Sequence, residues 1–223
     1  MPAVITCPAC GALEKQDIHI YNAALRKQQF ALSPILPTCK RCGTEVVIEH
    51  TCDGGQIIVL NGTSGSGKST VAEELAAQGF GAIDGDCVIQ SVRHKTGKKA
   101  YAWPDLIVEI AREIDILSLF GAPIVLSHVL LPDDMDAYIE MFATRRLDAA
   151  FFLLRPDYAT AVERCKTRTC HTSVTPEHWI KHFYDLLRFD DCMITVDNTQ
   201  QTPRETAAFV LAHAGGAARY GVT

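Results

Sequence analysis

A glycine-rich segment starting at residue 62 constrains the fold of this chain more than any other part of its sequence. Residues 62–69 read GTSGSGKS and match the pattern G-x-x-x-x-G-K-[ST]. The segment follows the β-rich run QIIVLN at residues 56–61 and precedes VAEELAAQ, which has the composition of a helix. Strand, loop and helix in this order let successive backbone N–H groups curl around a phosphate at a helix N-terminus. The alternative is a glycine-rich turn that matches by chance, and the flanking context favours a phosphate-binding loop.

This loop predicts a chemical role for each of its polar residues. Lys68 would reach the β- and γ-phosphates of a nucleotide, and the Ser69 hydroxyl would be a ligand of Mg²⁺. The predicted nucleotide-binding residues of the loop are Gly62, Thr63, Ser64, Gly65, Ser66, Gly67, Lys68, Ser69 and Thr70.

From residue 54 onward, short β-rich runs alternate with helical stretches. The expected strands are residues 56–61, 80–83, 123–127, 149–154 and 193–196. The expected helices are residues 68–78, 105–120, 133–142, 157–167, 176–189 and 203–214. This alternation predicts an α/β fold, a five-stranded parallel sheet with helices on both faces. At 48% hydrophobic residues the chain can bury such a core, which excludes intrinsic disorder.

Four of the nine cysteines form two matched pairs ahead of this alternation. Cys7 and Cys10, like Cys39 and Cys42, form a C-x-x-C followed by glycine, a turn that points two thiolates at one ion. Two such turns make a tetrahedral zinc site and resemble a zinc ribbon. Two disulfides or a redox C-x-x-C are the alternatives; a reducing compartment argues against the first, and the absence of a βαβ context argues against the second. We therefore predict a zinc-ribbon module over residues 1–53, with a strand at residues 45–50 (EVVIEH), and a second domain over residues 54–223.

The first residues and the overall charge limit location and partners. The segment MPAVITCPAC lacks the basic start and long apolar middle of a secretory signal. Residues 121–132, the longest nearly apolar stretch, are too few to cross a bilayer. We therefore expect a cytoplasmic protein without membrane contact. The formal charge of −5 argues against polyanion binding over the whole surface.

Two carboxylates, Asp84 and Asp86, follow the second expected strand in the sequence Asp-Gly-Asp. Two acids at a strand end can divide labour, one holding metal-bound water and the other facing an acceptor hydroxyl. A polar turn that closes the strand is the alternative. Motor proteins and GTP switches usually carry an Asp at the end of a hydrophobic strand, whereas here the third expected strand ends in Ser127-His128, and the N-K-x-D of GTPases is missing.

Together these features resemble the small P-loop kinases of the nucleoside-monophosphate kinase superfamily, which include the shikimate, gluconate and adenylylsulfate kinases and chloramphenicol phosphotransferase. The resemblance covers roughly residues 56–214. It implies ATP- and Mg²⁺-dependent transfer of the γ-phosphoryl group to a hydroxyl or a phosphate, with Asp86 at the acceptor and Asp84 nearer Mg²⁺.

The same resemblance identifies a lid and a base-binding loop. Arg164 and Arg168, four residues apart on one helical face, match lid arginines that stabilise charge on the transferring phosphate; two surface arginines are the alternative. Asn198, after the last expected strand, is placed like the loop that contacts adenine.

The sequence leaves the acceptor unassigned. Ser-His-Val-Leu-Leu-Pro follows the third strand, where a shikimate kinase carries a glycine triplet. His128 in this segment is either a substrate ligand or a structural residue. Basic residues follow Asp86 in the region that usually contacts the acceptor, so an anionic acceptor is a further hypothesis; they are Arg93, His94, Lys98 and Lys99.

The zinc ribbon raises two other functions. Zinc ribbons often bind nucleic acid, and Lys40 and Arg41 lie in the second knuckle, so an RNA or polynucleotide kinase, or an RNA-processing P-loop protein, is one alternative. A nucleotide-dependent adaptor without enzymatic activity is the other.

Overall fold

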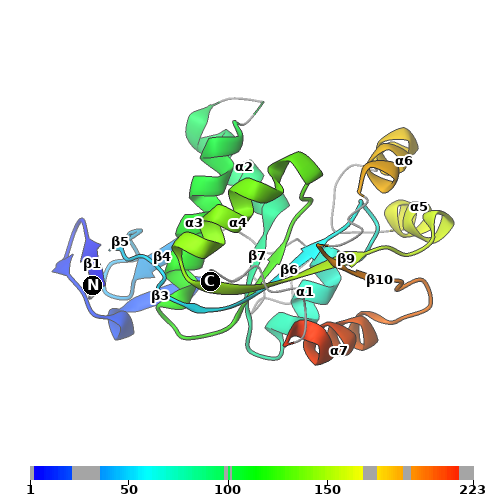
Figure 1. Ribbon diagram of the computed structural model, residues 1–223. Helices are drawn as coiled ribbons and strands as arrows, with labels where there is room; N and C mark the ends of the chain where they lie inside the picture. Colours follow the sequence, from blue (N-terminus) through cyan, green and yellow to red (C-terminus); the bar gives the residue numbers. More distant parts are fainter. Residues whose placement is uncertain are drawn as a thin grey trace.

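The computed structural model describes residues 3–21, 36–97, 100, 102–167, 175–187 and 192–215. Its central sheet has five parallel strands in the order β10-β9-β6-β8-β7 (Figure 1). These strands are β6 (Gly55–Asn61), β7 (Gly81–Asp84), β8 (Ile124–Ser127), β9 (Leu147–Leu154) and β10 (Ile194–Val196). The predicted five-stranded parallel sheet is therefore confirmed, with its first strand in the centre.

Helices cover both faces of this sheet (Figure 1). On one face lie α1 (Lys68–Ala76) and α7 (Pro203–Ala214). On the other lie α2 (Gly85–Thr96), α3 (Trp103–Ser118) and α4 (Met135–Thr144). Successive residues of a strand point to opposite faces, so β6 sends Ile57 and Val59 into one core and Ile58 and Leu60 into the other. All four are fully buried, as expected for a strand covered on both sides.

Two further helices, α5 (Tyr158–Thr167) and α6 (Glu177–Leu186), lie near the carboxyl end of β6. The Thr63 hydroxyl just after β6 lies 3.3 Å from the Ile180 carbonyl oxygen of α6 and donates a hydrogen bond to it. Among the described helices, none is both long and apolar enough to pass through a lipid bilayer.

The helix α2 was not predicted from the sequence, which indicated a turn around Asp84 and no helix between residues 78 and 105. Asp84 caps this helix: its Oδ1 accepts hydrogen bonds from the backbone N–H groups of Asp86 at 2.9 Å and Cys87 at 3.3 Å. The apolar residues Val88 and Val92, four apart, bury the inner face. Helical periodicity was thus present, but a glycine in the first turn and polar residues on the outer face obscured it.

The segment before the sheet forms two small antiparallel sheets. One has the order β2-β1-β5 and is built from β1 (Val4–Cys7), β2 (Gly11–Ala12) and β5 (Val47–Glu49). The other pairs β3 (Ile18–Tyr21) with β4 (Leu36–Cys39). The expected strand at residues 45–50 corresponds to β5. The apolar core of the segment is very small, consisting of Ile5, Leu13, Ile18 and Val46 with the cysteines Cys7 and Cys39.

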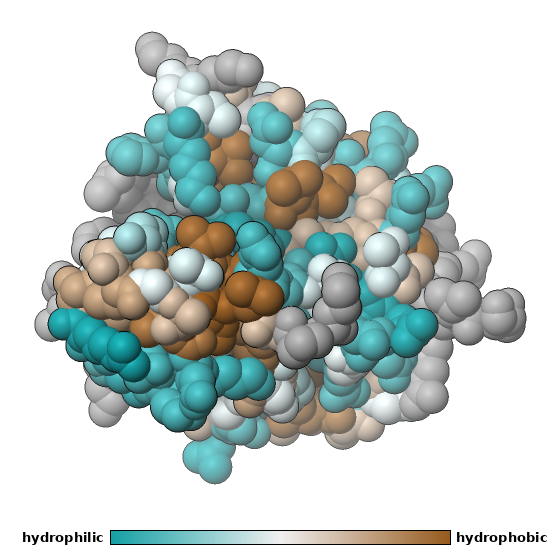
Figure 2. All heavy atoms as spheres, turned by 90° about the vertical axis from the view of Figure 1, so that its left-hand side faces the viewer, coloured by the Kyte–Doolittle hydropathy of each residue, from teal (hydrophilic) through white to brown (hydrophobic). Residues whose placement is uncertain are grey.

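This N-terminal segment contacts the carboxyl-terminal turns of α3 and α4. The Cys52 N–H donates to Asp115 Oδ1 at 2.8 Å, and Asp115 also accepts two hydrogen bonds of 2.9 Å from Arg145. His50 Nε2 lies 3.2 Å from the Ser118 hydroxyl. The segment therefore lies at the amino end of the parallel sheet (Figure 1). Figure 2 shows this end of the molecule, where hydrophobic patches reach the surface among hydrophilic side chains.

Candidate functional site

The glycine-rich loop between β6 and α1 adopts a backbone that requires glycine. Gly62, Gly65 and Gly67 have φ angles of +146°, +79° and +94°. A Cβ atom on Gly65 would lie 2.1 Å from the carbonyl oxygen of Ala161, and one on Gly62 would lie 2.5 Å from that of Leu154. The loop can therefore pass this close to α5 and β9 only without side chains at these positions.

Two buried asparagines hold this loop in place. Asn61 Oδ1 accepts hydrogen bonds from the N–H groups of Gly62 at 2.7 Å and Leu130 at 3.0 Å. Asn198 Nδ2 donates to the carbonyl oxygen of Ser66 at 2.9 Å. Asn198 thus supports the loop, whereas its contact with adenine stays a prediction. The sequence interpretation missed Asn61, although a polar residue closing an otherwise apolar strand is an observable sign of such a role.

Lys68 lies over the loop that precedes it. Its ammonium donates to the carbonyl oxygens of Gly62 at 2.6 Å and Thr63 at 3.0 Å. Both acceptors are neutral, and a phosphate oxygen is a stronger acceptor for an ammonium than a neutral carbonyl. The position of Lys68 therefore fits a phosphate in the loop.

Ser69, Asp84 and Ser127 form an oxygen-rich corner beside Lys68. The Ser69 hydroxyl donates to Asp84 Oδ2 at 2.8 Å, and Ser127 Oγ lies 3.5 Å from Ser69 Oγ. Burial, and then the charge of Asp86, raise the pKa of the Asp84 carboxyl. A cation would offset both effects, and hydroxyl and carboxylate oxygens are ligands that suit Mg²⁺. The donor set therefore fits Mg²⁺, with Ser69 and Asp84 as the residues that would hold it.

One of the two predicted lid arginines lies at this site. Arg164 on α5 donates from its guanidinium to the carbonyl oxygens of Asn198 at 2.9 Å and Thr199 at 3.2 Å. Arg168 lies outside the described residues, so its position is not addressed by the structure, and the same is true of Lys98 and Lys99.

A cavity of about 510 Å³ brings most of these residues together. Its loop side is lined by Ser64, Gly65, Gly67, Lys68, Ser69 and Thr70, with Arg164, Asn198, Gln201, Pro203 and Thr206 nearby. The remaining wall is formed by Val71, Asp84, Asp86, Ile89, Trp103, Ser127, His128, Val129, Leu131 and Phe183. Three predicted loop residues, Gly62, Thr63 and Ser66, are buried and do not line this cavity. Neither do Arg93 and His94.

His128, whose role the sequence left open, is buried beside this cavity. Its ring centroid lies 6.1 Å from that of Trp103 and 5.9 Å from that of Tyr138. Burial lowers the pKa of His128 to about 4; the charge of Asp86 opposes this and that of Lys68 adds to it. Within the described residues, neither ring nitrogen has a hydrogen-bond partner. The imidazole is therefore uncharged at neutral pH.

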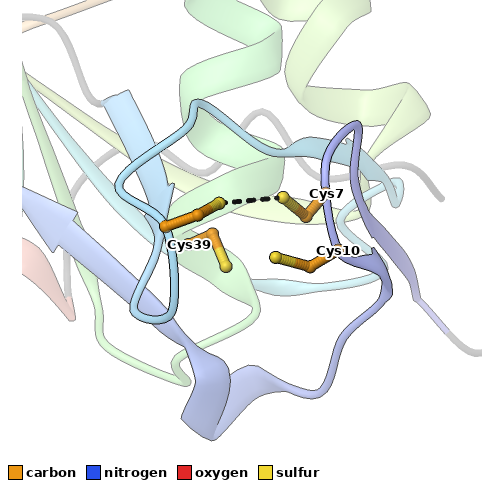
Figure 3. Close-up of side chains that lie close together, drawn as sticks. Cys7, Cys10 and Cys39 are labelled. Atoms are coloured by element: carbon orange, nitrogen blue, oxygen red, sulfur yellow. Dashed lines mark hydrogen bonds between the residues drawn. The ribbon is translucent and has the colours of Figure 1, made fainter.

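The four predicted zinc ligands form one cluster in the N-terminal segment. The Sγ atoms of Cys7, Cys10, Cys39 and Cys42 all lie within 4.8 Å of one another. Figure 3 shows the side chains of Cys7, Cys10 and Cys39 converging on one space. Four thiolates about 2.3 Å from an ion at the centre of a tetrahedron would have comparable sulfur separations.

The acidities of these thiols differ. Hydrogen bonding with Thr44 lowers the pKa of Cys42 to about 6, and hydrogen bonding with Cys42 raises that of Cys10 to about 12. A thiolate is the form that binds metal, so Cys42 supplies one ligand without further deprotonation. The donor set and its geometry therefore fit Zn²⁺.

Comparison with known proteins rests on solved structures, since neither a protein-family model nor a curated protein matches this sequence. A gluconokinase from Sinorhizobium meliloti 1021 is 26% identical, with a TM-score of 0.52, covering 74% of this chain and 93% of its own. The tunicamycin resistance protein of Deinococcus radiodurans is 16% identical, with a TM-score of 0.55, and the match covers 74% of this chain and 98% of that protein.

A third solved structure is the APS kinase CysC of Mycobacterium tuberculosis in complex with AMPPNP and APS. It is 18% identical, with a TM-score of 0.53, covering 72% of this chain and 97% of its own. The shared architecture includes the parallel sheet described above. By its fold, the chain is a P-loop kinase-type protein, and its N-terminal segment carries a four-cysteine cluster that fits a zinc ribbon.

Proposed function

We propose that this protein is an ATP- and Mg²⁺-dependent phosphotransferase that acts on a hydroxyl group of a small-molecule acceptor. The observation that carries the proposal is the 2.8 Å contact between Ser69 Oγ and Asp84 Oδ2, next to Lys68 and in one cavity with Asp86. This arrangement supports a cation site, a phosphate site and a carboxylate for an acceptor within one cavity. The gluconokinase and APS kinase folds support the same class of reaction.

The proposed step forms one bond and breaks another. The acceptor oxygen bonds to the γ-phosphorus, the bond from that phosphorus to the β–γ bridging oxygen breaks, and ADP leaves with the electron pair. Asp86 takes the hydroxyl proton. Lys68 and Arg164 stabilise negative charge on the phosphoryl oxygens, and Arg168 is proposed to do the same from the lid. Mg²⁺, when bound, would neutralise phosphate charge.

The position of Asp86 supports this role. It lies in the first turn of α2, is exposed, and lines the cavity. Its backbone N–H is held by Asp84, while its carboxylate makes no hydrogen bond or ion pair with the described residues. Asp84 and Asp86 thus have different tasks, since Asp84 is buried and engaged with Ser69.

Asp86→Asn tests this assignment. An amide cannot accept the proton, so we expect phosphotransfer to fall by about 10²–10⁴-fold, while ATP affinity measured by calorimetry stays within about threefold. Transfer would be followed as ADP release with a pooled panel of hydroxyl compounds.

Asp136→Asn is the matched control, because Asp136 is also an exposed acid in the first turn of a helix but does not line the cavity. Unchanged transfer by the Asp86 variant would show that Asp86 is not the base.

Lys68→Ala tests the phosphate site, and we expect this variant to lose ATP binding. Intact ATP binding and intact transfer in Lys68→Ala would reject the proposed function as a whole.

The structure favours a small acceptor over nucleic acid held by the ribbon. Lys40, in the second knuckle, donates to the carbonyl oxygen of Gln16, and Arg41 lies 3.2 Å from Asp17. The N-terminal segment that carries the cysteine cluster lies at the amino end of the parallel sheet (Figure 1). The cavity residues Lys68, Asp84 and Ser127, by contrast, lie at or just after the carboxyl ends of β6, β7 and β8. An acceptor bound at the ribbon would therefore lie far from Asp86.

A further inference from the structure

Part of the cavity wall is apolar beyond what phosphoryl transfer requires. The residues that follow β8 and those on α2, α3 and α6 contribute Ile89, Trp103, Val129, Leu131 and Phe183. We call these five residues, together with Asp86 and His128, the acceptor wall. Three of its elements, α2, α3 and the segment after β8, lie on the opposite side of the sheet from α1 and α7.

The cationic side chains of the described cavity belong to the loop side. Lys68 is held by the loop carbonyls, and Arg164 by the carbonyls of Asn198 and Thr199. In the acceptor wall the ionisable groups are Asp86, which is acidic, and the buried His128. A carboxylate, sulfate or phosphate on the acceptor would therefore lose its hydration beside another negative charge, and among the described residues of this wall no cation replaces the water.

Trp103 gives the acceptor wall a fixed aromatic surface. Its ring packs edge-on against His128, with centroids 6.1 Å apart and planes at 72°, and against Tyr138 at 6.1 Å and 90°. Perpendicular contacts with two buried rings hold the orientation of the indole. The half-buried indole lines the cavity in that orientation. A flat apolar ligand would bury area against it without first ordering the side chain.

We propose that the acceptor is an uncharged hydroxyl compound with an aromatic body, which packs on Trp103, Ile89 and Phe183 and places its hydroxyl at Asp86. The inference rests on the proposed function, because it concerns the acceptor of the same transfer. It differs from the hypothesis of an anionic acceptor. Of the basic residues behind that hypothesis, Arg93 and His94 do not line the cavity, and Lys98 and Lys99 lie outside the described part of the chain.

Three probes separate charge from shape. Phenylpropanediol is neutral and aromatic, phenyllactate keeps the ring but carries a carboxylate, and glycerol is neutral without a ring. Calorimetry would measure the binding of each to the full chain with Mg²⁺ and a non-hydrolysable ATP analogue, and phosphorus NMR would follow transfer from ATP. We expect phenylpropanediol to bind about tenfold more tightly than either of the others.

Ile89→Arg places a cation in the acceptor wall and is expected to reverse the order of phenylpropanediol and phenyllactate. Gln90→Arg is the matched control, because Gln90 is exposed on the same helix and outside the cavity, so the order should not change. Trp103→Leu is a second variant, expected to weaken phenylpropanediol binding about tenfold with the affinity for the ATP analogue unchanged.

The two proposals fail in different ways. Tighter binding of phenyllactate to the unmodified protein, equal binding of glycerol, or no binding of any probe overturns the acceptor class. Binding in the expected order without transfer to any hydroxyl compound overturns the phosphotransferase and leaves the acceptor class standing.

Discussion

Gly85 is a glycine because of a neighbouring side chain. In the sequence Asp-Gly-Asp it looks like a turn residue, yet it is the first residue of α2. A Cβ atom at this position would lie 2.0 Å from Nδ1 of His128. The contact places the imidazole against the first turn of α2, which carries Asp86. We therefore infer that His128 is a positioning residue, which holds the first turn of α2 through packing.

His128 is expected to make stability depend on pH. Its folded pKa of about 4 is below the unfolded value of 6.5, so the unfolded chain binds more protons between these values. The contribution of His128 to the free energy of unfolding is therefore complete above about pH 6.5 and is lost as the pH falls toward 4. The loss amounts to about 3 kcal/mol.

The measurement compares urea unfolding of the unmodified protein and of His128→Asn at several pH values. The difference in unfolding free energy should shrink by about 3 kcal/mol between pH 7 and pH 4. His94→Asn serves as the control, because His94 is exposed on α2. Parallel pH curves for the unmodified and His128→Asn proteins would refute the expectation.

Local motifs made some site residues predictable and left others hidden. Lys68 and Ser69 follow from eight consecutive residues, because the loop binds phosphate through its own backbone. Asn61 and Ser127 act through long-range contacts: Asn61 contacts Leu130, 69 positions away in the sequence, and Ser127 contacts Ser69, 58 positions away. Such contacts depend on which strands become neighbours, and the sequence predicted the strands without predicting their order.

At the scale of elements, the strands of the parallel sheet were predictable because each is an apolar run. In the N-terminal segment only β5 was predicted. The others there are short, and a core of a few side chains imposes little periodicity on them. The division of the chain at residue 53 stays a proposal.

The cap of α2 and the cation site share one side chain, Asp84, and two substitutions separate them. Asp84→Ser keeps a capping hydroxyl, whereas Asp84→Ala keeps neither cap nor carboxylate. We expect the Ser variant to be more stable than the Ala variant by about 1 kcal/mol in urea unfolding. Both should lose the Mg²⁺ dependence of ATP binding, because both lack the carboxylate. Full Mg²⁺ dependence in either variant would remove Asp84 from the cation site.

At the scale of the whole molecule, the cysteine cluster is expected to stabilise the N-terminal segment without serving the cavity. One zinc ion per chain should be found by elemental analysis, and Cys10→Ser should lower both zinc content and thermal stability, since this segment has little apolar core. ATP affinity should change by less than about threefold. Cys192→Ser is the control, because Cys192 is outside the cluster. An unmodified chain that contains no zinc, or a Cys10→Ser variant that loses ATP binding together with its zinc, would contradict this expectation.

The order of the strands has a consequence for local unfolding. The glycine-rich loop follows β6, which is hydrogen-bonded on both sides, whereas Asp84 ends β7, an edge of the described sheet. Edge strands open more readily than central ones in amide hydrogen exchange. Detachment of β7 alone would separate Asp84 from Ser69 while the loop stayed folded. A ligand that bridges these two residues would therefore slow hydrogen exchange along β7 more than along β6, even though the loop belongs to β6.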